Sequence, residues 1–323
     1  MVQPEAGPIP SRRGPKVVAL GGGHGLAASL AALRLLTDQL TAVVTVADDG
    51  GSSGRLRREF GVLPPGDLRM ALSALCDDGE WGLLWRDVLQ HRFASAGSLH
   101  DHAMGNLLIV TLWEVLGDAV AGLDTVARLL NARGRVLPMT SVPLDIEATV
   151  RGLDPGAPDD LTVVRGQVAV ATTSGHVDAV RLLPEDPPAC PEAVEAILDA
   201  DWVVLGPGSW FTSVIPHLKV PGLAEALRTT KARRCVTLNL TPQQGETEGF
   251  SPEAHLEVLA AHAPQLRIDA VLADPSSVDD GRALARVAND LGAGLLLRHV
   301  AAGADHHDPL RLAAAYRDLF GTA

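Results

Sequence analysis

The sequence predicts an α/β protein in which a doubly wound parallel sheet carries a smaller inserted α+β region. Short apolar runs rich in β-branched residues alternate with longer helical patterns near both ends of the chain. These runs are apolar throughout, as expected of parallel strands that helices cover on both faces. Between the two blocks the pattern changes, first to helices and then to short β-like pieces. With 323 residues the chain can bury a large core.

We expect the two end blocks, residues 16–60 and 190–323, to form a Rossmann-like nucleotide-binding core. The first block reads as a βαβ unit, with a strand at 16–20, a helix at about 27–37 and a strand at 41–47. The second block predicts four strands, at 202–205, 234–238, 268–272 and 294–300. Residues 1–15 hold four prolines and no apolar stretch that could form a signal-peptide core, and we expect a flexible tail.

Residues 61–189 predict the inserted region. Residues 67–133 are mainly helical in pattern, with the strongest helix at 103–116. From 135 to 183, the pieces "ATVRG", "VRGQVAV" and "HVDAVRLL" are spaced as in an antiparallel meander, with the loop "DPGAPDD" inside it.

The composition of the chain argues against nucleic-acid binding and membrane insertion. Acidic residues outnumber basic ones, 39 against 27, which argues against charge-driven binding to nucleic acid or anionic membrane. No window approaches about eighteen uninterrupted apolar residues, so we expect no membrane insertion. Cys76, Cys190 and Cys235 form neither a zinc knuckle nor a disulfide framework, which fits a cytoplasmic protein.

A first glycine-rich loop follows the first strand in "GGGHGLAASL". Gly23, Gly25 and Ala28 satisfy G-x-G-x-x-A, the spacing that permits a tight turn and close backbone approach to phosphate. The N-terminus of the following helix would face the anion. Asp48 comes twenty residues after Ala28, where an acidic residue commonly binds ribose hydroxyls. The pattern predicts a Rossmann-like nucleotide site.

A second and a third loop point to the same edge of the sheet. "VTVADDGGSSGRLR" predicts a loop that binds phosphate or sugar through backbone and hydroxyl groups, with arginine as a bidentate partner for phosphate. "LGPGSWFTSVIP" adds a Gly/Pro/Ser turn, which lacks the G-x-S-x-G elbow of a serine nucleophile. We therefore predict no catalytic residue and a ligand site formed by Gly21, Gly22, Gly23, His24, Gly25, Asp48, Asp49, Gly50, Gly51, Ser52, Ser53, Arg55, Asp67, Asn106, Gly206, Gly208, Ser209 and Asn239.

Several of these motifs have more than one interpretation. In "HDHAMGN", residues 100–102 could bind a metal ion, but helix capping with Asn106 directed at the crevice is favoured. Asp67 in "LPPGDLR" could be a helix N-cap or a ligand contact. Glu246 in "NLTPQQGETEGF" could be a general base or part of a solvated loop. Asp308 in "DHHDP" is predicted to cap the last helix.

Taken together and in order, "GGGHGL", "VTVADDGGSSGRLR", "LPPGDLR", "HAMGNLL", "LGPGSWFTSVIPHL" and "NLTPQQGETEGF" resemble the YvcK family over residues 16–319. This family belongs to the superfamily of 2-phospho-L-lactate transferase. The resemblance implies a cytoplasmic protein that binds UDP-sugars, notably UDP-N-acetylglucosamine, and links central carbon metabolism to cell-wall synthesis and cell shape. The chain departs from the family pattern at His24, where Thr is usual, at "NLTPQQGET", and at His306.

Two functions follow from this. The favoured one is a regulatory nucleotide-sugar binding protein with no required cofactor, with protein partners in wall synthesis and with homo-oligomerisation left open. The alternative is a transferase that acts on a substrate linked to a nucleotide diphosphate, with Asp48 or Asp49 holding Mg²⁺. A dehydrogenase would fit the first βαβ unit alone, and the second glycine-rich loop argues against it.

Overall fold

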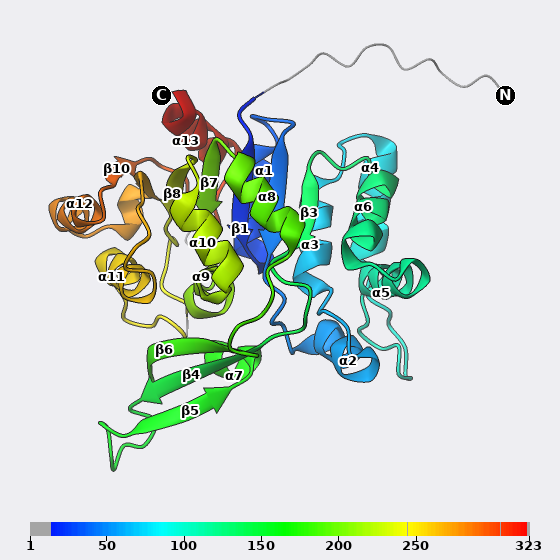
Figure 1. The fold of residues 1–323 in the computed structure, drawn as a ribbon, viewed down its shortest axis with the longest axis horizontal. Coiled ribbons are helices and arrows are strands. Elements are labelled where there is room, and N and C mark those ends of the chain that lie inside the picture. Colours follow the sequence, from blue (N-terminus) through cyan, green and yellow to red (C-terminus); the bar gives the residue numbers. More distant parts are fainter. Residues whose placement is uncertain (1–13, 244, 304, 322–323) are drawn as a thin grey trace.

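The computed structural model describes residues 14–243, 245–303 and 305–321. Most of the predicted tail lies outside the described residues. The core is a seven-stranded parallel sheet with strand order β10-β9-β8-β7-β1-β2-β3 (Figure 1). Its strands are β1 Val17–Gly21, β2 Leu40–Val44, β3 Arg135–Pro138, β7 Trp202–Leu205, β8 Arg233–Thr237, β9 Ala270–Ala273 and β10 Gly294–Leu297.

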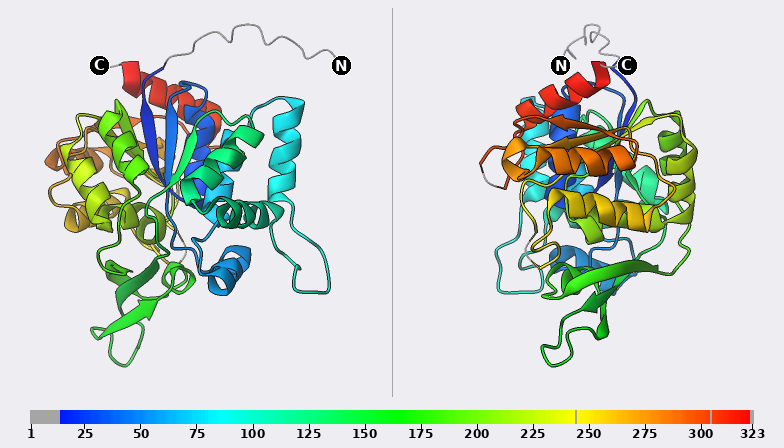
Figure 2. Two further views of the ribbon diagram at one scale, coloured as in Figure 1. Left: turned by 45° about the vertical axis from the view of Figure 1, so that its right-hand side comes forward. Right: turned by 90° about the vertical axis from the view of Figure 1, so that its left-hand side faces the viewer.

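Helices cover both faces of this sheet (Figure 2). On one face α1 packs against both α3 and α13, while α8 and α10 pack together on the other. The α-helices of the core are α1 Gly23–Leu33, α2 Gly51–Phe60, α3 Gly66–Leu75, α4 Glu80–Gln90, α5 Met104–Leu116, α6 Ala119–Leu129, α8 Pro191–Asp199, α9 Ile215–Lys219, α10 Pro221–Thr229, α11 Pro252–His262, α12 Gly281–Asp290 and α13 Pro309–Gly321. A π-helical turn, Trp210–Val214, precedes α9, and a 3₁₀ turn, Pro275–Ser277, follows β9. None of the described helices combines the length and apolar character needed to cross a membrane.

The strand order reverses between β1 and β7. From β1 the chain moves through α1 to β2 on one side, whereas from β7 it moves through α10 to β8 on the other. The two connections therefore leave neighbouring strands in opposite directions and open a crevice at the carboxyl ends of these strands, which is where ligands bind in sheets of this kind.

A small antiparallel sheet projects below the core in Figure 1. Its strands are β4 Asp145–Arg151, β5 Leu161–Arg165 and β6 His176–Leu183, in the order β5-β4-β6. Five residues between β5 and β6 form a short helix, α7 Gln167–Ala171. The large sheet also takes its edge strand β3 from residues 61–189, and α3 of the same range packs on α1.

The predicted α/β class with helices on both faces of a parallel sheet is confirmed, and several boundaries need correction. The first helix begins at Gly23 and ends at Leu33, and residues 34–37 form tighter turns, with Leu36 N–H donating to the carbonyl of Leu33. "VRGQVAV" is half strand and half helix, because Gly166, at φ +103°, ends the strand pairing. Residues 135–138 pair in parallel with β2 and take no part in the predicted antiparallel meander.

The last helix is fixed to the core by a buried hydroxyl. The Tyr316 hydroxyl lies 3.0 Å from Oγ of Ser29 in α1 and 2.9 Å from Oγ1 of Thr237 in β8. Ser29 in turn donates to the carbonyl of Gly206. Asp308 accepts from the N–H groups of Leu310 and Arg311 and caps α13 as predicted. Four segments far apart in sequence thus share one polar cluster beneath the crevice.

Replacing Tyr316→Phe removes these hydrogen bonds and keeps the ring. We expect the free energy of unfolding to fall by about 1–3 kcal/mol, because two hydroxyl partners in the interior lose a bond. Urea unfolding monitored by circular dichroism measures the change. Leu310→Ala on the exposed side of the same helix is the control, with an expected change within about 0.5 kcal/mol. Equal effects of the two substitutions would contradict this account.

Candidate functional site

The first glycine-rich loop lies at the carboxyl end of β1, among side chains from three other elements. A Cβ on Gly22 would stand 2.5 Å from Oδ2 of Asp67, 2.5 Å from Cγ2 of Thr45 and 3.2 Å from Oγ of Ser213. Gly23 has a φ of +56°, in the region that favours glycine. Glycine is needed here because neighbouring side chains and the backbone approach the loop closely.

The first and third loops touch each other at the point where the strand order reverses. A Cβ on Gly25 would lie 2.2 Å from the carbonyl oxygen of Pro207 and 2.6 Å from Cα of Gly208. Asn239, after β8, holds the same loop from the other side: its Oδ1 accepts from Gly208 N–H at 2.8 Å and its Nδ2 donates to the Gly208 carbonyl at 2.9 Å. The first turn of α1 therefore contacts the loop after β7, which Asn239 holds in place through two hydrogen bonds.

A pocket of about 470 Å³ opens beside this contact. Helix α1 contributes His24, Gly25 and Ala28, and the loop after β7 contributes Pro207 and Gly208. The remaining lining comes from Asn239, from Leu240–Gln243 and from Asp305–His307. The first helical N–H groups of α1 have no intrahelical acceptor, so this corner of the pocket favours an anion.

Two partly buried carboxylates lie beside the first loop. Asp48 accepts from Gly50 N–H at 2.9 Å, and burial raises its pKa. Asp67 accepts from Gly23 N–H, and burial together with the nearby charge of Asp48 raises its pKa to about 7. Asp67 is not the N-cap of α3, which is Pro65; its carboxylate faces the glycine loop instead.

The second glycine-rich segment is largely helical, so the predicted loop there is corrected. Residues 51–54 form the first turn of α2. Position 54 needs glycine, because a Cβ there would lie 1.9 Å from the carbonyl oxygen of Asp49. The short side chain of Ser53 accepts a hydrogen bond from Gly66 N–H through its Oγ. Gly50 and Gly51 form the entry to the helix, with Gly51 at φ +46°.

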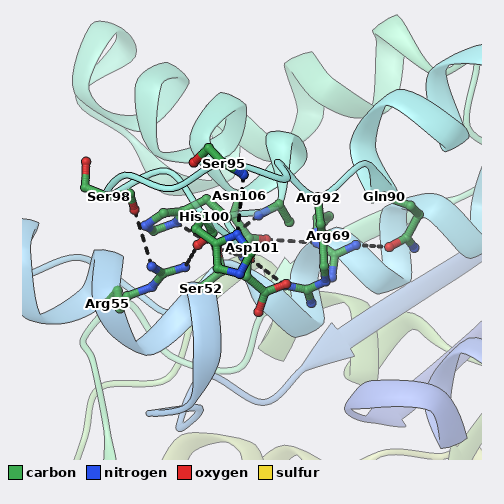
Figure 3. Close-up of polar contacts among 12 residues, drawn as sticks. Ser52, Arg55, Arg69, Gln90, Arg92, Ser95, Ser98, His100, Asp101 and Asn106 are labelled. Atoms are coloured by element: carbon green, nitrogen blue, oxygen red, sulfur yellow. Dashed lines mark hydrogen bonds and ion pairs between the residues drawn. The ribbon is translucent and has the colours of Figure 1, made fainter.

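Ser52 centres a buried network with α5 (Figure 3). Its Oγ lies 3.0 Å from Nδ1 of His102 and accepts from Ala103 N–H and from Asn106 Nδ2. Asn106 Oδ1 accepts from Nε of Arg69 at 2.9 Å. Asn106 is thus bound within the protein and does not line the pocket, and α5 has no side-chain cap, which corrects the capping interpretation of "HDHAMGN".

The metal interpretation of the same motif has no support in the part of the chain that the structure describes, where no group of three or more His, Cys, Asp or Glu could hold an ion.

Figure 3 shows Arg55 directed at the loop of residues 98–100, where it donates to the carbonyls of Ser98 and His100. Arg57 pairs with Asp145 at 2.5 Å. Neither arginine is placed as the predicted phosphate partner.

The two remaining acidic residues of the motifs hold structural elements together. Asp49 Oδ1 accepts from Val168 N–H at 3.0 Å and fixes α7 of the small sheet to the core. Glu246 is buried, and it accepts from Ser209 Oγ, Phe211 N–H and Thr212 N–H at the start of the π-helical turn. Burial raises the pKa of Glu246. The solvated-loop interpretation of Glu246 is wrong, and Ser209 is its hydrogen-bond partner.

Comparisons with known proteins give this arrangement a family. A family model described as "2-phospho-L-lactate transferase CofD" matches residues 17–291. A protein of Mycobacterium tuberculosis named "Putative gluconeogenesis factor" is 57% identical over 302 residues, which are 92% of this chain and 88% of that protein. The "Gluconeogenesis factor" of Halalkalibacterium halodurans is 38% identical over 264 residues, 82% of this chain and 79% of that protein.

A solved structure agrees with these sequence matches. The crystal structure of a UPF0052 family protein from Bacillus halodurans has a TM-score of 0.83 to this chain at 32% identity, and covers 94% of this chain and 98% of its own. The matched segments include the glycine-rich loops, Asp48 and Asp67, and most of the pocket lining. The chain therefore belongs to the gluconeogenesis factor family, also called YvcK or UPF0052, which shares the CofD domain.

Proposed function

We propose that the chain binds a nucleotide sugar, UDP-N-acetylglucosamine above others, in the crevice between α1 and the loop after β7. In this role it is a regulatory protein that links central carbon metabolism to cell-wall synthesis and cell shape through protein partners. The observation that carries the proposal is the pocket of about 470 Å³ beside the first turn of α1, at the reversal of strand order.

The first turn of α1 is the proposed diphosphate site. Its N–H groups and the positive end of the helix dipole favour an anion. Glycine at positions 22, 23 and 25 leaves this backbone uncovered by side chains of its own. His24 is exposed at the rim and is the side chain of this turn that a bound phosphate would meet first.

The opposite wall of the pocket suits the sugar or the base. Thr241 and Gln243 supply uncharged hydrogen-bonding groups. The buried Oε1 of Gln243 has no hydrogen-bond partner among the described residues, so it offers an acceptor to a hydroxyl or a base N–H. A ligand with a charged centre and neutral polar ends matches this distribution better than a compact anion does.

We place the Mg²⁺ that such a ligand could bring between Asp48 and Asp67. Their partly buried carboxylates lie close enough for the charge of Asp48 to raise the pKa of Asp67, and a divalent cation would relieve that repulsion. Asp49 fits less well, because Val168 N–H already occupies its carboxylate.

A transferase is the second candidate, favoured by the family model that matches residues 17–291. A carboxyl group with a pKa of about 7 beside the crevice is suited to proton transfer. Steady conversion of a nucleotide-linked substrate by the purified protein, followed by mass spectrometry, would favour this candidate over the regulatory one.

A charge reversal at the rim tests the proposed diphosphate site. We expect His24→Glu to weaken UDP-N-acetylglucosamine binding at least about tenfold, because the new carboxylate repels the phosphates. The fold should be kept, since an acidic residue in the first turn suits the helix dipole. Thermal-shift titration gives both quantities: a ligand at about 100 times its Kd stabilises the wild type by roughly 2.7 kcal/mol.

His24→Gln is the matched control and should retain most of the affinity, because it changes the same side chain without adding charge. UDP-glucose, GDP and NAD complete the ligand panel. A stabilisation by UDP-N-acetylglucosamine that His24→Glu leaves unchanged would remove the ligand from this turn. No stabilisation by any UDP-sugar would contradict the proposed function.

Asp67→Asn tests the carboxylate pair through the pH dependence of stability. Between the ordinary pKa of 3.8 and the folded value of about 7, the folded chain keeps a proton that the unfolded chain has released. The contribution of Asp67 to the stability of the wild type therefore falls as the pH rises through this window and is level above it. We expect the stability of Asp67→Asn relative to wild type to rise by about 1–3 kcal/mol from the lower to the upper end of the window.

Urea unfolding at a series of pH values measures this difference, with and without Mg²⁺. Above the window, Mg²⁺ should stabilise the wild type and leave Asp67→Asn unchanged. A pH-independent difference between the two proteins would show that Asp67 does not carry the raised pKa.

A further inference from the structure

The two edge strands of the small sheet are β6, which contacts α9 of the core, and β5. This strand pairs with β4 on one side, and no strand in the described ranges pairs with its other side. The views in Figures 1 and 2 show the sheet projecting away from the core. Leu161 and Val163 are 58% and 60% exposed. Neither proline nor lysine interrupts residues 161–165, although such residues usually protect a free edge against pairing.

The backbone groups at this edge follow from the pairing with β4. Gly166 N–H donates to the carbonyl of Ile146 at 2.8 Å, so this is a hydrogen-bonded position of the ladder. Hydrogen-bonded positions alternate in an antiparallel pair, so Val164 and Thr162 also direct their backbone groups at β4. The N–H and carbonyl groups of Leu161, Val163 and Arg165 consequently point to the free edge.

We infer that β5 pairs with β5 of a second copy of this chain, antiparallel and centred on Val163. The three outward positions are symmetric about Val163, so a two-fold axis there makes Val163 face Val163 and Leu161 face Arg165 in both directions. Each of these is a hydrogen-bonded pair, and the two small sheets join into one six-stranded sheet. This inference is independent of the proposed ligand.

The side chains of the same positions complement each other in this register. Leu161, Val163 and Arg165 lie on one face of the strand, because successive side chains alternate. Val163 would pack on its symmetry mate, and the aliphatic stem of Arg165 on Leu161. Asp159 lies in the turn before the strand, and the guanidinium of Arg165 pairs with Asp145 of its own chain at 2.7 Å. The pairing would thus cover an apolar centre that is otherwise exposed to water.

Self-complementarity selects a second copy as the partner. A strand of an unrelated protein would need its own matching pattern, whereas this pattern matches itself in shape and in hydrogen-bonding positions. The pairing also covers the two exposed apolar side chains of the strand, Leu161 and Val163.

The mass of the full chain in solution tests the inference, by sedimentation velocity over a concentration series. We expect a monomer–dimer equilibrium. Val163→Lys and Val163→Glu should each raise the dimer Kd at least about tenfold, since like charges would face each other at the axis. An equimolar mixture of the two variants should restore the dimer, because opposite charges then meet.

Thr162→Lys is the matched control: its side chain lies on the other face of the same strand and does not meet itself across the axis. It should dimerise more strongly than Val163→Lys. Circular dichroism and thermal unfolding establish that each variant is folded. A wild type that stays monomeric throughout would overturn the inference, as would a dimer that both Val163 variants leave intact, or a mixture that fails to restore dimerisation.

Discussion

The contact between Gly25 and the carbonyl oxygen of Pro207 fixes the geometry on which the site depends. A Cβ at position 25 would come within 2.2 Å of that oxygen, so α1 approaches the loop after β7 as closely as a backbone can. The same helix, one turn further on, donates from Ser29 to Gly206, and Tyr316 closes the cluster from α13. Asn239 braces Gly208 from behind. The crevice is the space that remains in front of this rigid junction.

The carboxylates beside the junction oppose stability. Asp48 and Asp67 are both partly buried, and each has a raised pKa, which means that the folded state disfavours their charged forms. Other polar side chains of the glycine-rich motifs have hydrogen-bond partners within the chain: Ser52 binds Asn106, Glu246 binds Ser209, and Asp49 binds the backbone N–H of Val168. Against this background, a repelling acidic pair next to a helix N-terminus is a feature that ligand binding explains better than folding does.

Sequence reasoning reached the architecture because apolar strands buried on both faces have a strong signature; β7 lies at the predicted residues 202–205. Sequence reasoning failed where the same residue types can serve either of two structural roles. "GGSSG" resembles a flexible loop, yet its small residues serve close packing within a helix turn. Asp67 resembles an N-cap, yet the approach of the glycine loop, a tertiary contact, decides where its carboxylate points. His306 and His307 reach the pocket only because the chain returns from the edge strand β10 and packs α13 against α1.

The central claim is that a nucleotide sugar sits against the first turn of α1, and hydrogen–deuterium exchange with and without UDP-N-acetylglucosamine tests it most directly. The account predicts slower exchange in peptides that cover residues 21–26 and 239–243, where backbone N–H groups line the crevice, and little change in the small sheet. Protection confined to other segments, or unchanged exchange at saturating ligand, would contradict it.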